Sequence, residues 1–269
     1  MQSTIFFILL VQIICHRVKI TIHPKYKHHQ EALSQVADSF FEKGTLLFQG
    51  SRNSIKKDSL GNEEINIKFF QKPGLVKSII YSFFKDSKAK RSFDYASYLI
   101  ENDILTPFPI AYVEERNSLG LLGKSYYICQ HINYDFTFRE LIHQPLFPNR
   151  KEILEQFAEF TFQMHEANIN FLDHSPGNTL IIEKENKKYD FYLIDLNRMK
   201  FESLSIVQRM ENFKKLWLSK QMIQIIAKKY AALAEQPEKE IEQLLTKFSS
   251  QFKRKAARKK YIKKFVGKK

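Results

Sequence analysis

The first half of the chain has the hydrophobic pattern of short strands. Ile65, Ile67 and Phe69 alternate with polar residues, and this period of two predicts a strand over Ile65–Phe70. Ser59–Asn62 is rich in turn-forming residues and predicts a turn before that strand. The other strands predicted in this part of the chain are Lys19–His23, Thr45–Phe48, Ile110–Glu114 and Ser125–Gln130.

Helical spacing appears first at Ser87–Asn102, where Phe93, Ala96, Leu99 and Ile100 recur at intervals of three and four. After about residue 132 this spacing dominates. The elements predicted there are helices at Lys151–Ala167, 205–219, 221–234 and 238–264, and strands at Thr179–Ile182 and Tyr189–Ile194. The predicted fold class is therefore α+β, with a small β-rich lobe followed by a helical lobe.

These patterns divide the chain into four parts. We expect an apolar N-terminal extension at 1–16, an N-terminal lobe at 17–132, a C-terminal lobe at 133–252 and a basic tail at 253–269. Within the extension, Ile5–Cys15 is too short to span a bilayer, and neither a basic segment nor a cleavage site accompanies it. We interpret it as an extended or misassigned start, with a membrane-associated segment as the alternative.

The charge of the chain indicates the class of its partner, and its cysteine content indicates the compartment. The chain has 43 Lys and Arg against 29 Asp and Glu, a net charge of +14, which predicts an anionic partner. Ten of the basic residues lie in the tail, which contains no acid. The tail could contact an anionic membrane face or remain a solvated helix end, and nucleic acid would use the same charges. Two cysteines are too few for a disulfide framework, which favours a reducing, cytosolic compartment.

The candidate chemistry lies in two short segments. Asp173 and Asn178 flank a Pro-Gly turn, and Asp195 ends the apolar run that begins at Phe191. Kinase-like phosphoryl transfer needs one carboxylate beside the acceptor hydroxyl, and one amide and one carboxylate on magnesium. We therefore interpret Asp173 as the catalytic base, and Asn178 and Asp195 as Mg²⁺ ligands.

A lysine on a strand completes this hypothesis. Lys68, on the predicted strand Ile65–Phe70, would neutralise the nucleotide phosphates, and Asp94 on the following helix would hold it. Each feature alone has an ordinary structural explanation, as a loop, a strand end or a solvated lysine. Their joint order and spacing favour phosphoryl transfer.

Residues from about 17 to 250 resemble the lipopolysaccharide kinase (Kdo/WaaP) family, relatives of the protein-kinase fold. The segments that carry this resemblance are Ser51-Arg52-Asn53, Ile67–Phe70, Ala89–Phe93, Asp173–Asn178 and Asp195. The resemblance implies a two-lobed protein-kinase-like fold and ATP-dependent phosphorylation of a sugar hydroxyl of the lipopolysaccharide inner core, with Kdo as the first candidate and heptose as the second. It implies ATP and Mg²⁺ as cofactors.

The resemblance also implies roles for individual residues. Asp173 would be the base, Asn178 and Asp195 the metal ligands and Lys68 a phosphate ligand. Arg52 and Asn53 lie in the turn expected over the phosphates, and the backbone of Gln130 to Ile132 would meet the adenine. The chain departs from the family pattern at Phe171, where a histidine is usual, at Asn197 after Asp195, and at Asp94, where a longer Glu is usual.

Other functions remain open at this level. The acceptor could be another small molecule or a protein, and a catalytically silent scaffold that binds nucleotide or nucleic acid is a different class. The intact set of Asp173, Asn178 and Asp195 favours the enzyme over the scaffold, and we do not expect nucleic acid as the partner. Acceptor choice should depend on loops such as Tyr134–Arg150. The predicted location is cytoplasmic, with the basic tail indicating the inner membrane face.

Overall fold

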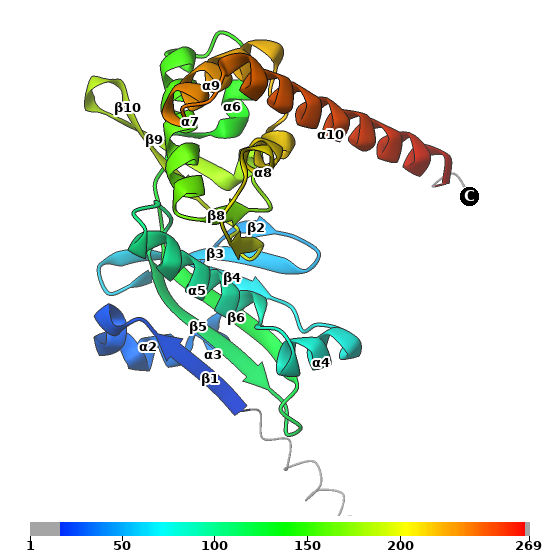
Figure 1. Ribbon diagram of the computed structural model, residues 1–269. Helices are drawn as coiled ribbons and strands as arrows, with labels where there is room; N and C mark the ends of the chain where they lie inside the picture. Colours follow the sequence, from blue (N-terminus) through cyan, green and yellow to red (C-terminus); the bar gives the residue numbers. More distant parts are fainter. Residues whose placement is uncertain (1–16, 267–269) are drawn as a thin grey trace, which may run out of the picture. The chain divides into compact units, whose positions relative to one another are not determined.

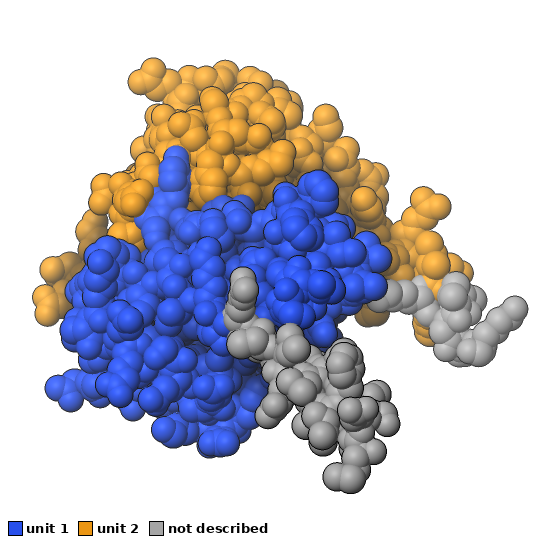
Figure 2. All heavy atoms as spheres, turned by 90° about the horizontal axis from the view of Figure 1, so that it is seen from below, with its two compact units in different colours: residues 1–98, 107–132 blue, residues 99–106, 133–269 orange. Residues whose placement is uncertain are grey.

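The computed structural model describes residues 17–266, which form two compact units (Figure 2). Unit 1 contains residues 17–98 and 107–132, and unit 2 contains residues 99–106 and those from 133 onward. The extension predicted at residues 1–16 lies outside the described residues. Within 17–266, no helix combines the length and the apolar sequence needed to cross a bilayer.

Unit 1 is built on a six-stranded antiparallel sheet with the strand order β1-β5-β6-β4-β3-β2 (Figure 1). The strands are β1 (Arg17–Ile22), β2 (Thr45–Gln49), β3 (Asn53–Leu60), β4 (Glu63–Phe70), β5 (Pro109–Arg116) and β6 (Leu122–Gln130). All but β3 were predicted. Ile55 and Leu60 are its only apolar residues, so it shows no alternation, and its ladder with β4 holds it in the sheet.

Three short helices cover one face of this sheet. They are η1 (Pro24–His29), α2 (Gln30–Ser34) and α3 (Val36–Ser39), and the sequence predicted none of them. Tyr26, Leu33 and Val36 from these helices share a buried cluster with Ile65 and Ile67 of β4. Each helix is too short to show a helical period, so only the packing reveals it.

The other helices of unit 1 are α4 (Leu75–Phe83) and α5 (Lys88–Glu101), whose last three residues belong to unit 2. Helix α5 matches the predicted Ser87–Asn102, and its Phe93 ring lies 5.4 Å from the ring of Tyr112 on β5. Tyr112 alternates with the buried Ala111 and Val113 of the first cluster, so α5 covers the opposite face of the sheet. Helix α4 was not predicted.

Unit 2 is mainly helical, with two small sheets. Its strands are β7 (Phe136–Thr137), β8 (Ile169–Phe171), β9 (Thr179–Lys184), β10 (Lys188–Leu193) and β11 (Met199–Phe201). Its helices are α6 (Phe138–His143), α7 (Arg150–Glu166), η2 (Pro176–Asn178), η3 (Glu185–Lys187), α8 (Ile206–Asn212), η4 (Phe213–Leu216), α9 (Lys220–Leu233) and α10 (Glu238–Val266). The sheets have the orders β10-β9-β7 and β11-β8.

Two sequence predictions about unit 2 need correction. The single helix predicted at 205–219 is divided into α8 and the 3₁₀ helix η4, which ends where Trp217 adopts a left-handed backbone with φ of 59°. A left-handed residue cannot continue a right-handed helix. The sequence also predicted no strands at Phe136–Thr137, Ile169–Phe171 or Met199–Phe201, where the structure has β7, β8 and β11.

The core of unit 2 contains two completely buried histidines, His165 on α7 and His174 after β8. His165 Nδ1 lies 2.9 Å from the Tyr230 hydroxyl, and His174 Nδ1 lies 2.8 Å from Asn212 Oδ1. Burial lowers the pKa of His174 to about 4. The pKa of His165 is lowered to about 3, mainly by burial and secondly by repulsion from a protonated His174. Both side chains are therefore neutral at pH 7.

These histidines predict that unit 2 loses stability in acid. Above pH 6.5 neither the folded nor the unfolded chain protonates them. As the pH falls below 6.5, the unfolded chain binds two protons that the folded chain excludes, so the free energy of unfolding decreases until the pH reaches the folded pKa values. We expect a loss of about 3 kcal/mol from each histidine between pH 7 and pH 4.

The measurement is urea unfolding at several pH values for the wild type and His165→Leu. The variant should lose a substantial part of the pH dependence in this range. Met164→Leu, at a buried neighbour on the same helix, is the control and should shift stability equally at every pH. Parallel curves for the wild type and His165→Leu would contradict the prediction.

Candidate active site

A seven-residue loop, 172–178, connects β8 to β9 and carries Asp173 and Asn178. Its backbone is held by hydrogen bonds from the Leu172 amide to the Arg198 carbonyl and from the Asn178 amide to the Ser175 carbonyl. Pro176 begins the 3₁₀ turn η2, which suits its fixed φ and missing amide hydrogen. The predicted Pro-Gly turn is therefore one tight helical turn between the two polar residues.

Asn178 forms hydrogen bonds with both segments that carry the candidate aspartates. Its side-chain Nδ2 donates to the backbone carbonyl of Asp173 at 2.9 Å. Its own carbonyl accepts from the backbone amide of Ile194 at 3.0 Å, next to Asp195. The structure thus brings Asp173, Asn178 and Asp195 onto adjoining loops, although 22 sequence positions separate the two aspartates.

Asp195 has a left-handed backbone, with φ of 60°. Asn197 Nδ2 donates to its Oδ1 at 2.6 Å. Asn197 is one of the departures from the family pattern, and its amide orients the Asp195 carboxylate.

The oxygen chemistry of this site fits magnesium. Asn178 offers an amide oxygen and Asp195 a carboxylate, and Mg²⁺ binds through one or two such protein ligands together with phosphate oxygens and water. Among residues 17–266, no group of three or more His, Cys, Asp or Glu side chains is placed to hold a metal ion. The donor set therefore suits a metal that the nucleotide brings with it better than a protein-enclosed zinc site.

Two cations that the sequence did not point to lie beside Asp173. Lys215 Nζ, from η4, is 2.9 Å from Asp173 Oδ1 and 2.7 Å from the Leu172 carbonyl. Arg198 Nη1 is 3.7 Å from Asp173 Oδ2. Both cations contact the Asp173 carboxylate and restrict its position. No local motif could identify Lys215, because it is 42 positions from Asp173 in the sequence.

A buried network holds the loop from the other side. Asn212 Oδ1 faces His174 Nδ1, and Asn212 Nδ2 lies 2.9 Å from both the Phe171 carbonyl and Asn170 Oδ1. Phe171 stands where the family pattern has a histidine, and here its ring is buried 5.8 Å from the ring of His174. In this chain the structural histidine follows Asp173 directly.

The predicted phosphate-binding residues belong to unit 1. Lys68 lies on β4, between β3 and β6, with its Nζ 5.6 Å from the centre of the Phe70 ring. Arg52 and Asn53 lie at the turn between β2 and β3, where the Gly50 amide donates to the Asn53 carbonyl at 2.8 Å. A Cβ on Gly50 would come within 2.9 Å of Asn53 Oδ1 and of the Phe48 ring, so these side chains would have to move to accommodate it.

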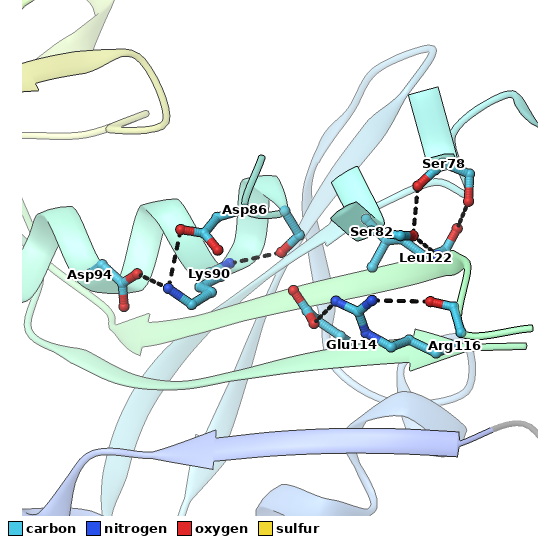
Figure 3. Close-up of polar contacts among 10 residues, drawn as sticks. Ser78, Ser82, Asp86, Lys90, Asp94, Glu114, Arg116 and Leu122 are labelled. Carbon is cyan, nitrogen blue, oxygen red and sulfur yellow. Dashed lines mark hydrogen bonds and ion pairs between the residues drawn. The ribbon is translucent and has the colours of Figure 1, made fainter. Parts of the chain in front are cut away.

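Asp94 lies on α5 with its carboxylate 2.6 Å from Lys90 Nζ, one helical turn away (Figure 3). Lys90 also contacts Asp86 at 3.2 Å. Burial alone would lower the pKa of Lys90, but its hydrogen bonds to Asp94 and Asp86 outweigh this effect and raise it. The ion pair that the sequence assigned to Lys68 and Asp94 stays a prediction.

The predicted adenine-binding backbone is partly engaged within unit 1. The Gln130 amide donates to the Phe108 carbonyl at 2.9 Å, and the His131 amide donates to the Glu64 carbonyl at 2.8 Å. The Gln130 side chain donates to the Tyr26 hydroxyl at 2.8 Å. Of the three amides from Gln130 to Ile132, that of Ile132 is therefore the better candidate for a nucleotide contact.

Unit 2 also contains a cavity of about 560 Å³ beside the loop of Asp173. It is lined by Arg139, Ile142, His143, Ser175, Pro176, Gly177, Trp217 and Lys253. Arg139, Ile142 and His143 come from the segment expected to govern acceptor choice, whereas Trp217 and Lys253 were missed. Trp217 is the single tryptophan of the sequence, and this was the one sequence feature that could have drawn attention to it. In the structure its side chain is half-exposed.

Gly177 gives the cavity its close contact with Arg139. A Cβ at this glycine would lie 2.6 Å from Arg139 Nη2, so the guanidinium rests directly on the loop between Asp173 and Asn178. Lys253 Nζ is anchored by a 2.7 Å hydrogen bond to the Leu218 carbonyl. The cavity thus has fixed positive charge and an aromatic wall next to the candidate base.

One solved structure shows the same fold. A structure described as "WaaP in complex with acyl carrier protein" is 14% identical, covers 89% of this chain and 98% of its own, and has a TM-score of 0.62. The Rio2 kinase–ADP/Mg²⁺–phosphoaspartate complex from Chaetomium thermophilum is 12% identical, covers 91% of this chain and 75% of its own, and has a TM-score of 0.46. The predicted α+β, two-lobed protein-kinase-like fold is confirmed.

Sequence comparison gives the family. No curated protein matches the chain. The pattern of the lipopolysaccharide kinase (Kdo/WaaP) family matches residues 70–237, a range that includes Asp173, Asn178 and Asp195 and begins just after Lys68. Because this match spans more than half of the sequence, the chain belongs to the lipopolysaccharide kinase (Kdo/WaaP) family.

Proposed function

We propose that this protein transfers the γ-phosphate of ATP to a hydroxyl group of Kdo in the lipopolysaccharide inner core. The observation that carries the proposal is the position of Asn178, which is hydrogen-bonded to the Asp173 backbone and to the backbone next to Asp195. This arrangement supplies a base and two magnesium ligands on adjoining loops. Family membership supports ATP as the phosphate donor.

In this proposal, Asp173 accepts the proton of the acceptor hydroxyl as that oxygen bonds to the γ-phosphorus. The bond from the γ-phosphorus to the bridging oxygen breaks, and ADP leaves. Asn178 and Asp195 hold the magnesium ion, which neutralises phosphate charge when bound. Lys215 and Arg198 contact the Asp173 carboxylate and position it toward the acceptor hydroxyl.

The nucleotide-binding roles in unit 1 follow from the sequence. Lys68 would neutralise the α- and β-phosphates, the turn of Arg52 and Asn53 would cover them, and the backbone near Ile132 would meet the adenine. Asp94 would have to exchange Lys90 for Lys68 in order to hold the phosphate-binding lysine.

In this proposal, the acceptor binds in the cavity beside the Asp173 loop. Kdo is an acidic sugar, so its carboxylate would pair with Arg139 and Lys253, and a sugar face would pack on Trp217. A neutral sugar would leave both cations without an anionic partner. This charge match favours Kdo over a neutral heptose.

The basic end of α10 gives a further proposal about location. Residues 253–264 continue the helix in one unbroken run (Figure 1). Their described side chains are mostly exposed. We infer that this helix end contacts an anionic membrane face, where each Lys or Arg contributes about 1 kcal/mol. Such a contact would hold the enzyme near an acceptor that is assembled at the membrane.

The first test is Asp173→Ala with Mg-ATP and a Kdo-containing acceptor. Loss of the base should lower the rate by about a hundredfold or more while the protein stays folded. Labelled phosphate transfer gives the rate, and circular dichroism checks the fold. Asp190→Ala, which removes a surface carboxylate of β10 that pairs with Lys184, should keep full activity. Full activity in Asp173→Ala would remove Asp173 as the base.

The second test concerns the acceptor cavity. Arg139→Gln and Trp217→Leu should each raise the KM for the acceptor by about tenfold or more, since each removes a contact with the sugar acid. The KM for ATP should stay unchanged. Lys151→Gln, which removes an exposed cation on α7, is the matched control. An unchanged acceptor KM in both cavity variants would place the acceptor elsewhere.

A further inference from the structure

Helix α4 exposes its apolar residues to solvent. Leu75, Val76 and Phe83 are 70%, 72% and 67% exposed, and Phe84 just after the helix is 82% exposed. Ile79 and Ile80 complete the same face, because positions i, i+1, i+4, i+5 and i+8 lie on one side of a helix. The helices of a globular domain normally turn this face toward the core.

Serines hold the opposite face of α4 against the sheet. Ser78 Oγ donates to the Leu122 carbonyl at 2.6 Å, and the Leu122 amide donates to Ser82 Oγ at 2.9 Å (Figure 3). Ser82 Oγ in turn donates to the Ser78 carbonyl at 2.6 Å. Ser78 is buried, so these bonds fix the rotation of the helix. The outward direction of the apolar face follows from specific polar contacts.

The sequence segment that carries this face is basic. From Gln71 to Lys88 the chain has four lysines, Lys72, Lys77, Lys85 and Lys88, and a single acid. That acid, Asp86, is paired with Lys90. Leu119, in the turn just before Leu122, adds an apolar side chain that is 75% exposed. An apolar face with a lysine rim is typical of helices that lie in a membrane interface.

We propose that α4 docks unit 1 onto an anionic lipid surface, with its apolar face among the headgroups and upper acyl chains and its lysines against lipid phosphates. The charge of the rim selects this occupant over a second copy of the chain. Two such faces in contact would bring lysines together around an apolar centre, whereas an anionic bilayer satisfies both parts. The inference is independent of the proposed catalysis and of the basic tail.

The test measures binding of the full chain to vesicles of phosphatidylcholine and phosphatidylglycerol. Val76→Glu/Phe83→Glu should weaken binding by about tenfold or more, because it places charge where apolar contact forms. The matched control is Leu146→Glu/Val207→Glu, which puts the same charges at exposed apolar positions of unit 2 and should bind like the wild type. Circular dichroism confirms that both variants fold.

Two further arms separate α4 from the basic tail. At about 0.5 M salt, where surface charges are screened, deletion of residues 253–269 should have little effect while Val76→Glu/Phe83→Glu still weakens binding. Phe83→Trp reports insertion directly, since its added fluorescence over the wild type should shift to the blue on anionic vesicles and be quenched by brominated lipids.

Three outcomes would overturn the proposal. One is equal vesicle binding by the wild type and Val76→Glu/Phe83→Glu at both salt concentrations. Another is an unshifted Phe83→Trp signal on vesicles that hold the protein. The third is a dimer in solution that Val76→Glu/Phe83→Glu dissociates, without α4-dependent vesicle binding, which would assign the face to a second copy.

Discussion

One backbone hydrogen bond, from the Ile194 amide to the Asn178 carbonyl, joins the loops that carry Asp173 and Asp195. It continues the ladder of β9 and β10, so the rigidity of a hairpin sets the position of a polar site. The Asn178 side chain extends this connection to the Asp173 backbone. A site that needs sub-ångström positioning gains from support by strands rather than by free loops.

Two neighbouring residues of unit 2 differ in charge: Asp173 is paired with cations at the surface, and His174 is neutral in the interior. Asp173 is held between Lys215 and Arg198 at the surface of the loop. Immediately behind it, His174 is buried and neutral, because removal from water disfavours its protonated form. With a neutral imidazole there, the cations paired with the Asp173 carboxylate are Lys215 and Arg198.

Unit 1 uses polar contacts in a complementary way. Its core lies on the face of the sheet covered by η1, α2 and α3, where Tyr26 and Leu33 pack on β4. Ser78 and Ser82 attach the polar side of α4 to β6. The apolar side of the helix is therefore exposed to water, which costs free energy unless a partner covers it. Burial therefore explains the sheet, whereas the orientation of α4 is explained by hydrogen bonds.

The sequence alone determined the α+β class, the order of the main strands and helices, and the polar residues at Asp173, Asn178 and Asp195, because hydrophobic period and turn chemistry are local properties. It missed β3, which has few apolar residues, and the short helices of residues 24–39. Lys215, Arg198, Trp217 and Lys253 lie far from Asp173 in the sequence, so only tertiary packing could bring them to its loop and cavity. The direction of α4 likewise depended on two serines meeting Leu122 of a distant strand, a contact that no local pattern encodes.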